Sequence, residues 1–289
     1  MLAVLVLTGT SCTVVRQYPE NRPFHFENNI KIEANLSRDE KADIKSRLAG
    51  AWSRLGPSVA LGFPWLKALN PAGYERLQSQ VIPGYGSLAR LAVALLAASP
   101  VATAAGAEVL VAGCGTGAEL VEAVAQRPDW RLTAIDPSDE MLQESRQRLG
   151  DQAAIDWRQT TVEALVDQPG IAGRYAGALS VLVLQSLPDD GSKLAFLTAL
   201  ARSLQPGAQL VLVDLMQTSL PSLEGQLEAA WGGFQQASGL AAQPGTSNQG
   251  LHPIGLARLT SLVNAAGFGD PARVFQALGF EGFLLQRRA

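Results

Sequence analysis

The stretch VLVAGCGTG, residues 109–117, decides the fold of this chain. A short apolar run ends there in glycines at alternate positions, Gly113, Gly115 and Gly117, and a helical pattern follows over residues 118–126. Glycine lets the backbone approach a ligand closely, because it has no Cβ and adopts positive φ at little cost. The start of the following helix offers free N–H groups to an anion. The pattern therefore predicts a strand, a turn and a helix that together bind a ligand.

A second apolar run ends in Asp136, about twenty residues after the glycine turn. An acidic residue at the tip of the second strand is placed to accept hydrogen bonds from ribose hydroxyls. The glycines follow the order G-x-G-x-G, and no third glycine stands at the spacing of the dinucleotide fingerprint G-x-G-x-x-G. Together the two features predict a nucleoside-cofactor site of another kind. As the alternative, Asp136 only caps the helix that begins near Ser138.

Strand and helix patterns alternate beyond residue 100 with short connections, which predicts a parallel sheet covered by helices on both faces. The last two strands are separated by a short break at Gly279, which suits a terminal antiparallel pair. The expected fold class is α/β, a Rossmann-like doubly wound sheet that is mostly parallel, with a helical N-terminal cap. The expected strands are 108–112, 131–136, 155–159, 176–182, 209–215, 272–278 and 280–285, and the expected helices are 117–126, 138–149, 191–204, 221–238 and 255–266.

The composition allows a large core, since 47% of the 289 residues are hydrophobic and 17% are charged. The net charge of −3 argues against a broad nucleic-acid-binding surface, so neither DNA nor RNA is the expected partner, although a local patch could bind RNA. The two cysteines, Cys12 and Cys114, are far apart, and no spacing of Cys, His or carboxylates predicts a metal site. Cys114 is expected to be a small buried residue within the turn.

The composition changes near residue 48, which is a candidate domain boundary. We expect an N-terminal extension over residues 1–48, either native to the protein or foreign to it. A helical cap over residues 49–100, broken at prolines, and a cofactor-binding domain over residues 101–289 follow.

The extension has two alternative interpretations. The apolar residues 2–7 before Cys12 hint at a secretory or lipoprotein signal, but no basic region precedes them and the run is short. The stretch 11–21 faintly resembles the start of outer-membrane assembly proteins. Alternatively, the extension packs loosely, with a strand over residues 30–32 and a helix over residues 38–48. No segment reaches membrane-spanning length, and the expected location is the cytoplasm.

Several motifs resemble those of the class I S-adenosylmethionine (SAM)-dependent methyltransferases. The resemblance implies the fold described above, SAM as the cofactor, and methyl transfer to a small-molecule acceptor. It covers most of the chain, and besides the glycine turn it rests on residues 135–141, 157–162, 183–190 and 204–213, within the range 83–287.

The resemblance also implies which residues contact the cofactor at the carboxyl ends of the strands. The glycine turn would face the methionine part, Asp136 the ribose and Met141 the adenine. Thr161 occupies the position where an acidic side chain usually meets the adenine amine, and its hydroxyl can accept one hydrogen bond without charge. As the alternative, Thr161 caps a helix that begins at Val162. The expected cofactor-binding residues are Tyr85, Gly113, Cys114, Gly115, Gly117, Asp136, Pro137, Met141, Thr161, Val162 and Val181.

Within this class, the chain is similar to the carboxy-SAM synthase branch of tRNA wobble-uridine modification. The similarity implies that Tyr85 contacts the cofactor from the cap. However, Val181 replaces a polar residue of that branch, and no arginine stands between Ser238 and His252 to bind the extra carboxylate. Ordinary SAM is therefore the expected cofactor. The similar segments are residues 81–86, 184–187 and 265–268.

Methyl transfer from a sulfonium needs mainly an oriented nucleophile in a dry pocket. His252 is the candidate general base, and the alternative is an ordinary loop histidine beside Pro253. Trp65, Trp231 and Phe234 could line the acceptor pocket, but packing between cap helices is the expected role. A SAM-binding scaffold without activity and assembly as a homodimer remain open.

Overall fold

The computed structural model describes residues 71–150, 155–217, 221–240 and 250–289, and the backbone of three strands near the N-terminus. The chain divides into two compact units, residues 1–59 and 60–289. In the first unit, β1 pairs antiparallel with β2 and parallel with β3. The strand expected over residues 30–32 is present as β3, and the helix expected over residues 38–48 lies outside the described residues. The bounds are β1 Ala3–Thr8, β2 Ser11–Val15 and β3 Ile30–Glu33.

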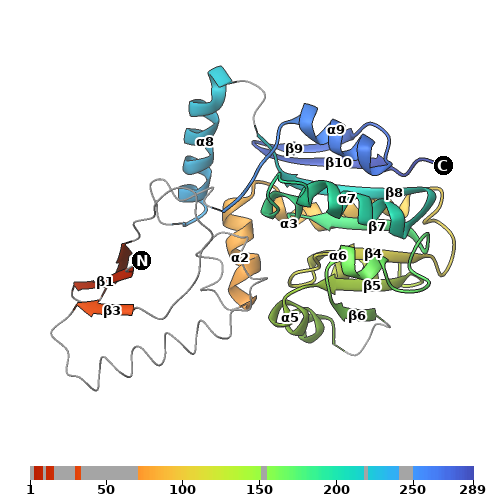
Figure 1. Ribbon diagram of the computed structural model, residues 1–289, viewed down its shortest axis with the longest axis horizontal. Coiled ribbons are helices and arrows are strands. Elements are labelled where there is room, and N and C mark those ends of the chain that lie inside the picture. The colour runs from red at the N-terminus through yellow and green to blue at the C-terminus, as the bar shows by residue number, and fades with distance from the viewer. Residues whose placement is uncertain are drawn as a thin grey trace. The chain divides into compact units, whose positions relative to one another are not determined.

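The second unit contains a sheet with the strand order β6-β5-β4-β7-β8-β10-β9 (Figure 1). The first five strands in this order are parallel, and β10 is antiparallel to both β8 and β9. The predicted architecture is thus confirmed, and the strand order reverses on either side of β4, where doubly wound sheets bind ligands. The bounds are β4 Glu108–Ala112, β5 Arg131–Asp136, β6 Ile155–Gln159, β7 Tyr175–Val181, β8 Leu204–Leu215, β9 Ala272–Ala277 and β10 Phe280–Gln286.

Strand β8 begins earlier than the predicted residue 209. Leu204 already pairs with Tyr175, and the regular register resumes only where Gln209 faces Gly177. Between these pairs lies Gly207 with φ +77°, so an irregular ladder accommodates the proline–glycine turn. The proline–glycine turn, which was expected to precede the strand, therefore lies within β8.

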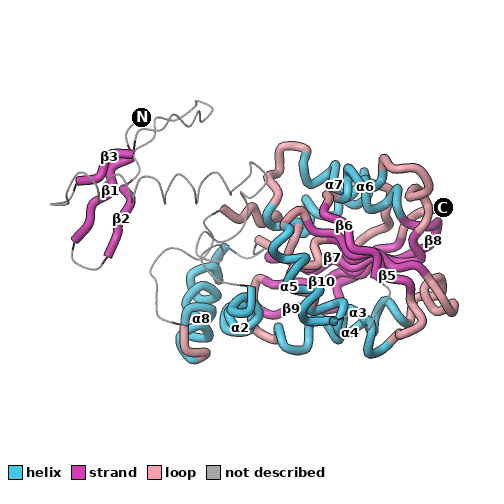
Figure 2. Tube along the Cα trace, turned by 90° about the horizontal axis from the view of Figure 1, so that it is seen from below, coloured by secondary structure: helices cyan, strands magenta, loops and turns pink. Residues whose placement is uncertain are grey.

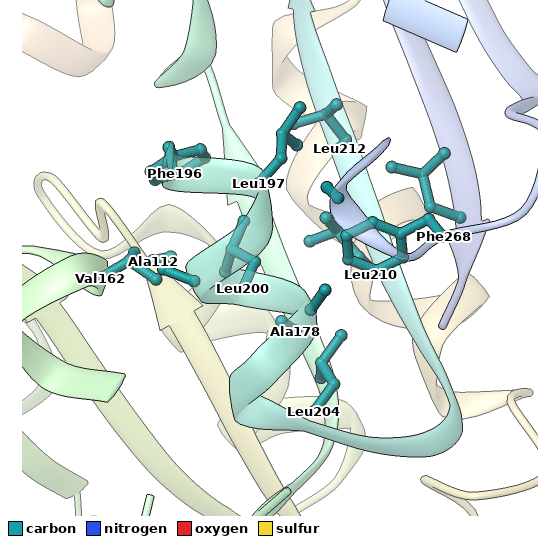
Figure 3. Close-up of a cluster of buried hydrophobic side chains, with 14 of the residues drawn as sticks. Ala112, Val162, Ala178, Phe196, Leu197, Leu200, Leu204, Leu210, Leu212 and Phe268 are labelled. Atoms are coloured by element: carbon teal, nitrogen blue, oxygen red, sulfur yellow. The ribbon is translucent and has the colours of Figure 1, made fainter. Parts of the chain in front are cut away.

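Helices cover both faces of the sheet (Figure 2). Those of one face, α3, α4 and α5, contribute to one buried core, and those of the other, α6, α7 and α9, contribute to a second. Figure 3 shows part of the second core, which includes Phe196 and Leu200 of α7 together with Leu210, Leu212 and Phe268. The bounds are α3 Tyr85–Ala97, α4 Ala118–Gln126, α5 Asp139–Leu149, α6 Val162–Val166, α7 Ser192–Ser203 and α9 Leu256–Ala266.

Two further helices, α2 (Pro71–Val81) and α8 (Glu224–Ala237), pack against each other outside these layers (Figure 1). The indole N–H of Trp231 on α8 donates to the carbonyl oxygen of Val81 at 2.6 Å. The Trp231 ring meets Phe280 edge-on, with the centroids 5.7 Å apart. Trp231 is therefore a packing residue, as expected, and Trp65 lies outside the described residues.

Prolines mark the bounds of the cap helices. A break was expected at Pro71 and at Pro83; Pro71 is the first residue of α2, where a missing N–H costs nothing, and Pro83 separates α2 from α3. Among the described residues, no single helix has the length and apolar composition to cross a membrane. Residues 73–81 and 85–97 meet these criteria only as a pair, bent by 94°.

Candidate cofactor-binding site

The glycine turn joins β4 to α4, and its three glycines have φ values of +72°, +50° and +85°. A Cβ at Gly113 would lie 2.4 Å from Val183 Cγ2, and one at Gly117 would lie 2.2 Å from Ser145 Oγ. These two glycines are needed because neighbouring elements pack against the backbone. A Cβ at Gly115 would meet nothing within 4 Å. Gly115 is thus the part of the turn that faces open space.

The Asp136 carboxylate ties this turn to the end of β5. The backbone N–H of Gly115 donates to its Oδ2 at 3.0 Å, and that of Ser138 donates to its Oδ1 at 2.9 Å. Burial raises the pKa of Asp136, and the two amide hydrogen bonds oppose this rise. Since each carboxylate oxygen can accept more than one hydrogen bond, Asp136 can still bind ribose hydroxyls. The side chain that caps α5 is Ser138, which accepts from Met141 N at 3.3 Å.

The predicted adenine contacts lie at the ends of β5 and β6. Pro137 is exposed, and Met141 is half-buried in the first turn of α5. Thr161 Oγ1 accepts from Ala164 N at 3.3 Å, so this side chain caps α6, as the alternative interpretation had it. The Thr161 hydroxyl can still donate its hydrogen to a ligand. Val162 is the first residue of α6, and its side chain is buried in the second core, so only its backbone could contact a ligand.

The remaining predicted contacts flank the glycine turn. Cys114 is buried, and burial raises the pKa of its thiol, so it acts as a small packing residue. Val181 is the last residue of β7 and is half-buried. It is followed by Leu182, which has φ +62° although it is not a glycine. Backbone strain of this kind is concentrated at functional sites, and here it directs the chain so that Val183 reaches Gly113.

A polar cluster at the glycine turn was not predicted from the sequence. Glu75 of α2 accepts with Oε1 from Thr116 Oγ1 at 2.6 Å and from the Tyr85 hydroxyl at 3.3 Å. The same oxygen lies 3.1 Å from Arg148 Nη1. Helices α2, α3 and α5 and the glycine turn therefore meet at one carboxylate oxygen. Tyr85, the predicted cap contact, lies in this cluster with its hydroxyl bound to Glu75.

Glu119, in the first turn of α4, is a second acid that the sequence analysis missed. Its side chain is buried, and this burial raises its pKa to about 7. The charge of Glu75 adds to the rise, whereas its own backbone amide and the charge of Arg148 oppose it. The helical phase could have identified it, because Glu119 shares the buried side of α4 with Ala123.

Another buried polar network lies at the ends of β7 and β8. Asp214 Oδ1 accepts from Gln185 N at 2.9 Å, and Gln185 Oε1 accepts from Leu215 N at 2.8 Å. The buried ammonium of Lys193 donates to the carbonyl oxygen of Leu184 at 2.5 Å. Burial raises the pKa of Asp214 to about 7, against the Gln185 amide and the positive charge of Lys193. The network fastens the segment after β7, including the 3₁₀ turn η3 (Leu184–Ser186), to β8.

The candidate base His252 lies beside this second network. Its backbone N–H donates to the carbonyl oxygen of Gln185 at 2.7 Å. Its role as a base stays a prediction. Within the part of the chain that the structure describes, no group of His, Cys, Asp and Glu could hold a metal ion.

Comparison with known proteins agrees with this geometry. Residues 109–228 match the family model described as a methyltransferase domain. The match begins in β4, just before the glycine turn, and extends into α8. It therefore includes the glycine turn, Asp136, Thr161 and Glu119. A search of curated proteins finds no significant match.

Solved methyltransferases share the fold at low sequence identity. A Haloferax volcanii methyltransferase, solved in complex with a methyltransferase activator, has 17% identity and a TM-score of 0.54, covering 80% of this chain and 100% of that one. The mitomycin 7-O-methyltransferase MmcR has 17% identity and a TM-score of 0.53, covering 78% of this chain and 60% of that one. Human N-acetylserotonin methyltransferase in complex with SAM has 16% identity and a TM-score of 0.50, covering 84% of this chain and 67% of that one. The family match and the Rossmann-like fold together support a class I methyltransferase with SAM as its cofactor.

Proposed function

We propose that this protein transfers the methyl group of SAM to a small-molecule acceptor. One observation carries the proposal: the buried carboxylate of Asp136 is bonded to Gly115, the glycine of the turn that faces open space. Asp136 thus holds the turn in a conformation in which the backbone at Gly115 is open to the approach of a ligand.

The residues of this chain bind and orient the reactants. Asp136 holds the ribose hydroxyls, and the turn around Gly115 accommodates the methionine end. When bound, SAM supplies an activated methyl group on a positively charged sulfur. We expect Thr161 and the backbone of Val162, which follow β6, to contact the adenine. Because orientation and exclusion of water provide much of the rate in such transfers, the chain needs a base only for a weak nucleophile, and His252 is the candidate for it.

A small acceptor suits what is known of this fold and chain. Two of the methyltransferases with the same fold are named for small molecules, mitomycin and N-acetylserotonin. The net charge of −3 does not favour an extended contact with nucleic acid. The Haloferax volcanii structure is a complex with an activator protein. Whether this chain assembles with a partner or with itself is therefore a further outcome to measure.

Calorimetry with SAM and with S-adenosylhomocysteine (SAH) tests the proposal. We expect micromolar binding of both, and we expect Asp136→Asn to weaken SAM by roughly 1–3 kcal/mol, because an amide places N–H groups against backbone donors and removes the charged acceptor. Asp139→Asn is the matched control, because Asp139 is exposed on α5 and bonds to Gln143. A folded protein that binds neither compound contradicts the proposal. SAH formation with a panel of phenols, amines and carboxylates then identifies the acceptor, and binding without turnover indicates a scaffold.

The cofactor could alternatively be carboxy-SAM, as in the branch of tRNA-modifying enzymes. We propose ordinary SAM, because no arginine stands between Ser238 and His252 and because Arg148, beside the glycine turn, pairs with Glu75. Competition between SAM and carboxy-SAM distinguishes the two. A clear preference for carboxy-SAM, or its production from SAM and prephenate, overturns the ordinary assignment.

A further inference from the structure

We propose that Glu75 is a positioning residue for the methionine end of the cofactor: from helix α2 of the cap, it fixes the glycine turn through the hydroxyl of Thr116. The inference rests on the proposed function, and it adds to the site a residue that lies outside the range 109–228 matched by the methyltransferase family. It follows from the backbone of the turn, from the contacts of Thr116 and from the separate anchoring of Asp136.

The second half of the glycine turn has a single side chain by which the protein can hold it. Thr116 stands between Gly115 and Gly117, whose φ values are +50° and +85°. Glycine loses more conformational freedom on folding than any other residue, so this part of the backbone needs an anchor. Thr116 is only 3% exposed, and its hydroxyl therefore needs a partner within the protein. The contacts of Thr116 thus determine the conformation of the turn around Gly115.

One ion pair holds both the side chain and the backbone of Thr116. Thr116 Oγ1 donates to Glu75 Oε1 at 2.6 Å, within the range of about 2.5–2.7 Å that is typical of a hydroxyl bound to a carboxylate. Arg148 Nη1 donates to the Thr116 carbonyl oxygen at 3.4 Å and lies 3.1 Å from the same Glu75 oxygen. Helices α2 and α5 are therefore joined to the turn at this one residue.

Asp136 has an anchor that does not depend on this ion pair. The N–H of Gly115 donates to its Oδ2, and the N–H of Ser138, the cap residue of α5, donates to its Oδ1 at 2.9 Å. Since Ser138 lies outside the turn, Asp136 keeps this bond when Thr116 loses its own. Removing the contact between Glu75 and Thr116 should therefore loosen the part of the turn assigned to the methionine end and leave the carboxylate assigned to the ribose in place.

The two ends of the cofactor separate this role from a structural one. 5′-Methylthioadenosine (MTA) has the nucleoside and the thioether sulfur of SAH but lacks the amino-acid end. If Glu75 only fastens α2 to the sheet, its loss should lower stability and affect SAH and MTA alike. If Glu75 positions the turn, its loss should weaken SAH and leave MTA nearly unchanged.

The test is calorimetry on the full chain with SAM and SAH, and with MTA in competition against SAH. Thr116→Val replaces the hydroxyl by a methyl group and leaves the ion pair of Glu75 with Arg148 intact, so it is the decisive variant. We expect SAM and SAH to bind about tenfold more weakly and MTA to stay within about twofold, because one hydrogen bond to a charged group is lost. Thr116→Ser keeps the hydroxyl and should recover most of the affinity.

A double variant tests whether Glu75 acts through Thr116. Glu75→Met should weaken SAH as Thr116→Val does, and the two changes together should weaken it no more than Glu75→Met alone, because both remove the same contact. Glu122→Met is the matched control. It removes another ion pair between two helices, that of Glu122 on α4 with Arg90 on α3, and all three affinities should stay within about twofold. Urea denaturation of each variant measures the accompanying change in stability.

The outcomes distinguish this role from the proposed function. If neither SAM nor SAH binds the wild type, the proposed function fails. If both bind, the positioning role is wrong when Thr116→Val leaves SAH unchanged or weakens SAH and MTA equally. It is also wrong when MTA does not compete in the wild type, because the nucleoside half is then not held on its own. In these cases the proposed function stands.

Discussion

Two buried carboxylates, Glu119 beside the glycine turn and Asp214 at the end of β8, have the same raised pKa of about 7 for the same reason, which is burial. Their partners differ. Asp214 accepts from the Gln185 amide, and the buried Lys193 supplies a positive charge within the protein. The Glu119 carboxylate accepts a hydrogen bond from its own backbone amide, and Arg148, whose charge lowers its pKa, forms an ion pair with Glu75.

The comparison shows that a raised pKa reports burial and does not by itself identify a ligand site. What separates the two regions is whether the protein provides the compensating charge. At Asp214 it does, although the second oxygen, Oδ2, has no hydrogen-bond donor among the described residues. We therefore assign Asp214 to the stability of the segment after β7.

Removing Asp214 should have the largest effect. Asp214→Ala removes the larger of the two carboxylate charges that act on the buried Lys193 ammonium and leaves the Gln185 amide without its acceptor. We expect the free energy of unfolding to fall by about 3–5 kcal/mol. Urea denaturation measures the loss. Adding Lys193→Met to this variant should restore part of the stability, because it removes the unpaired charge. A loss below about 1 kcal/mol in Asp214→Ala would mean that the network does not hold the segment as described.

Replacing Glu119 by its uncharged amide should instead raise the free energy of unfolding. The pKa of Glu119 is about 7 in the folded chain and 4.5 as its ordinary value, so the folded state binds this proton more tightly than the unfolded state. Its contribution to stability is therefore complete at low pH and is lost as the pH rises towards 7 and beyond. We expect Glu119→Gln to raise the free energy of unfolding by roughly 2–3 kcal/mol at pH 8 and by much less at pH 5. Denaturation at both pH values measures this, and a variant that is destabilised at pH 8 contradicts it.

Two glycines of the turn should separate packing from ligand binding. Both Gly113→Ala and Gly115→Ala put a Cβ on a residue with positive φ, which costs about 1–2 kcal/mol of stability. Gly113→Ala should cost more, because its Cβ would collide with Val183. Gly115→Ala should lose SAM affinity out of proportion to its stability, since its Cβ enters the open side of the turn. If the loss of SAM affinity, relative to the loss of stability, is the same in both variants, Gly115 has no special role in binding.

The smallest effect is expected from the N-terminal unit. A chain that begins at Ala60, the first residue of the second compact unit, should bind SAM within about twofold of the full chain. The described site residues all lie in the second unit. Calorimetry on both chains measures the difference, and a tenfold loss in a folded protein would show that the first unit contributes to the site.

The sequence predicted the sheet well and the site only in part. Strands β4 and β5 have their predicted bounds because each is an apolar run closed by turn residues. Strand β6 also has its predicted bounds, although its sequence is mostly polar. The turn and Asp136 were found because their signal is local. Glu75 could not be found in this way, since its partners Thr116 and Arg148 are brought to it only when α2 packs at the turn. Thr161 caps α6, as one of its two interpretations has it, and its contact with the adenine stays a prediction.

The convergence of three donors on Glu75 Oε1 also has a consequence for how the molecule opens. Segments around residues 75, 85, 116 and 148 share one acceptor, so lifting α2 breaks contacts to all of them together. Local opening of such a linked group is cooperative. The amides of α2 and of the first turn of α3 should therefore exchange with deuterium at a common rate, and bound SAM should slow that exchange as a unit.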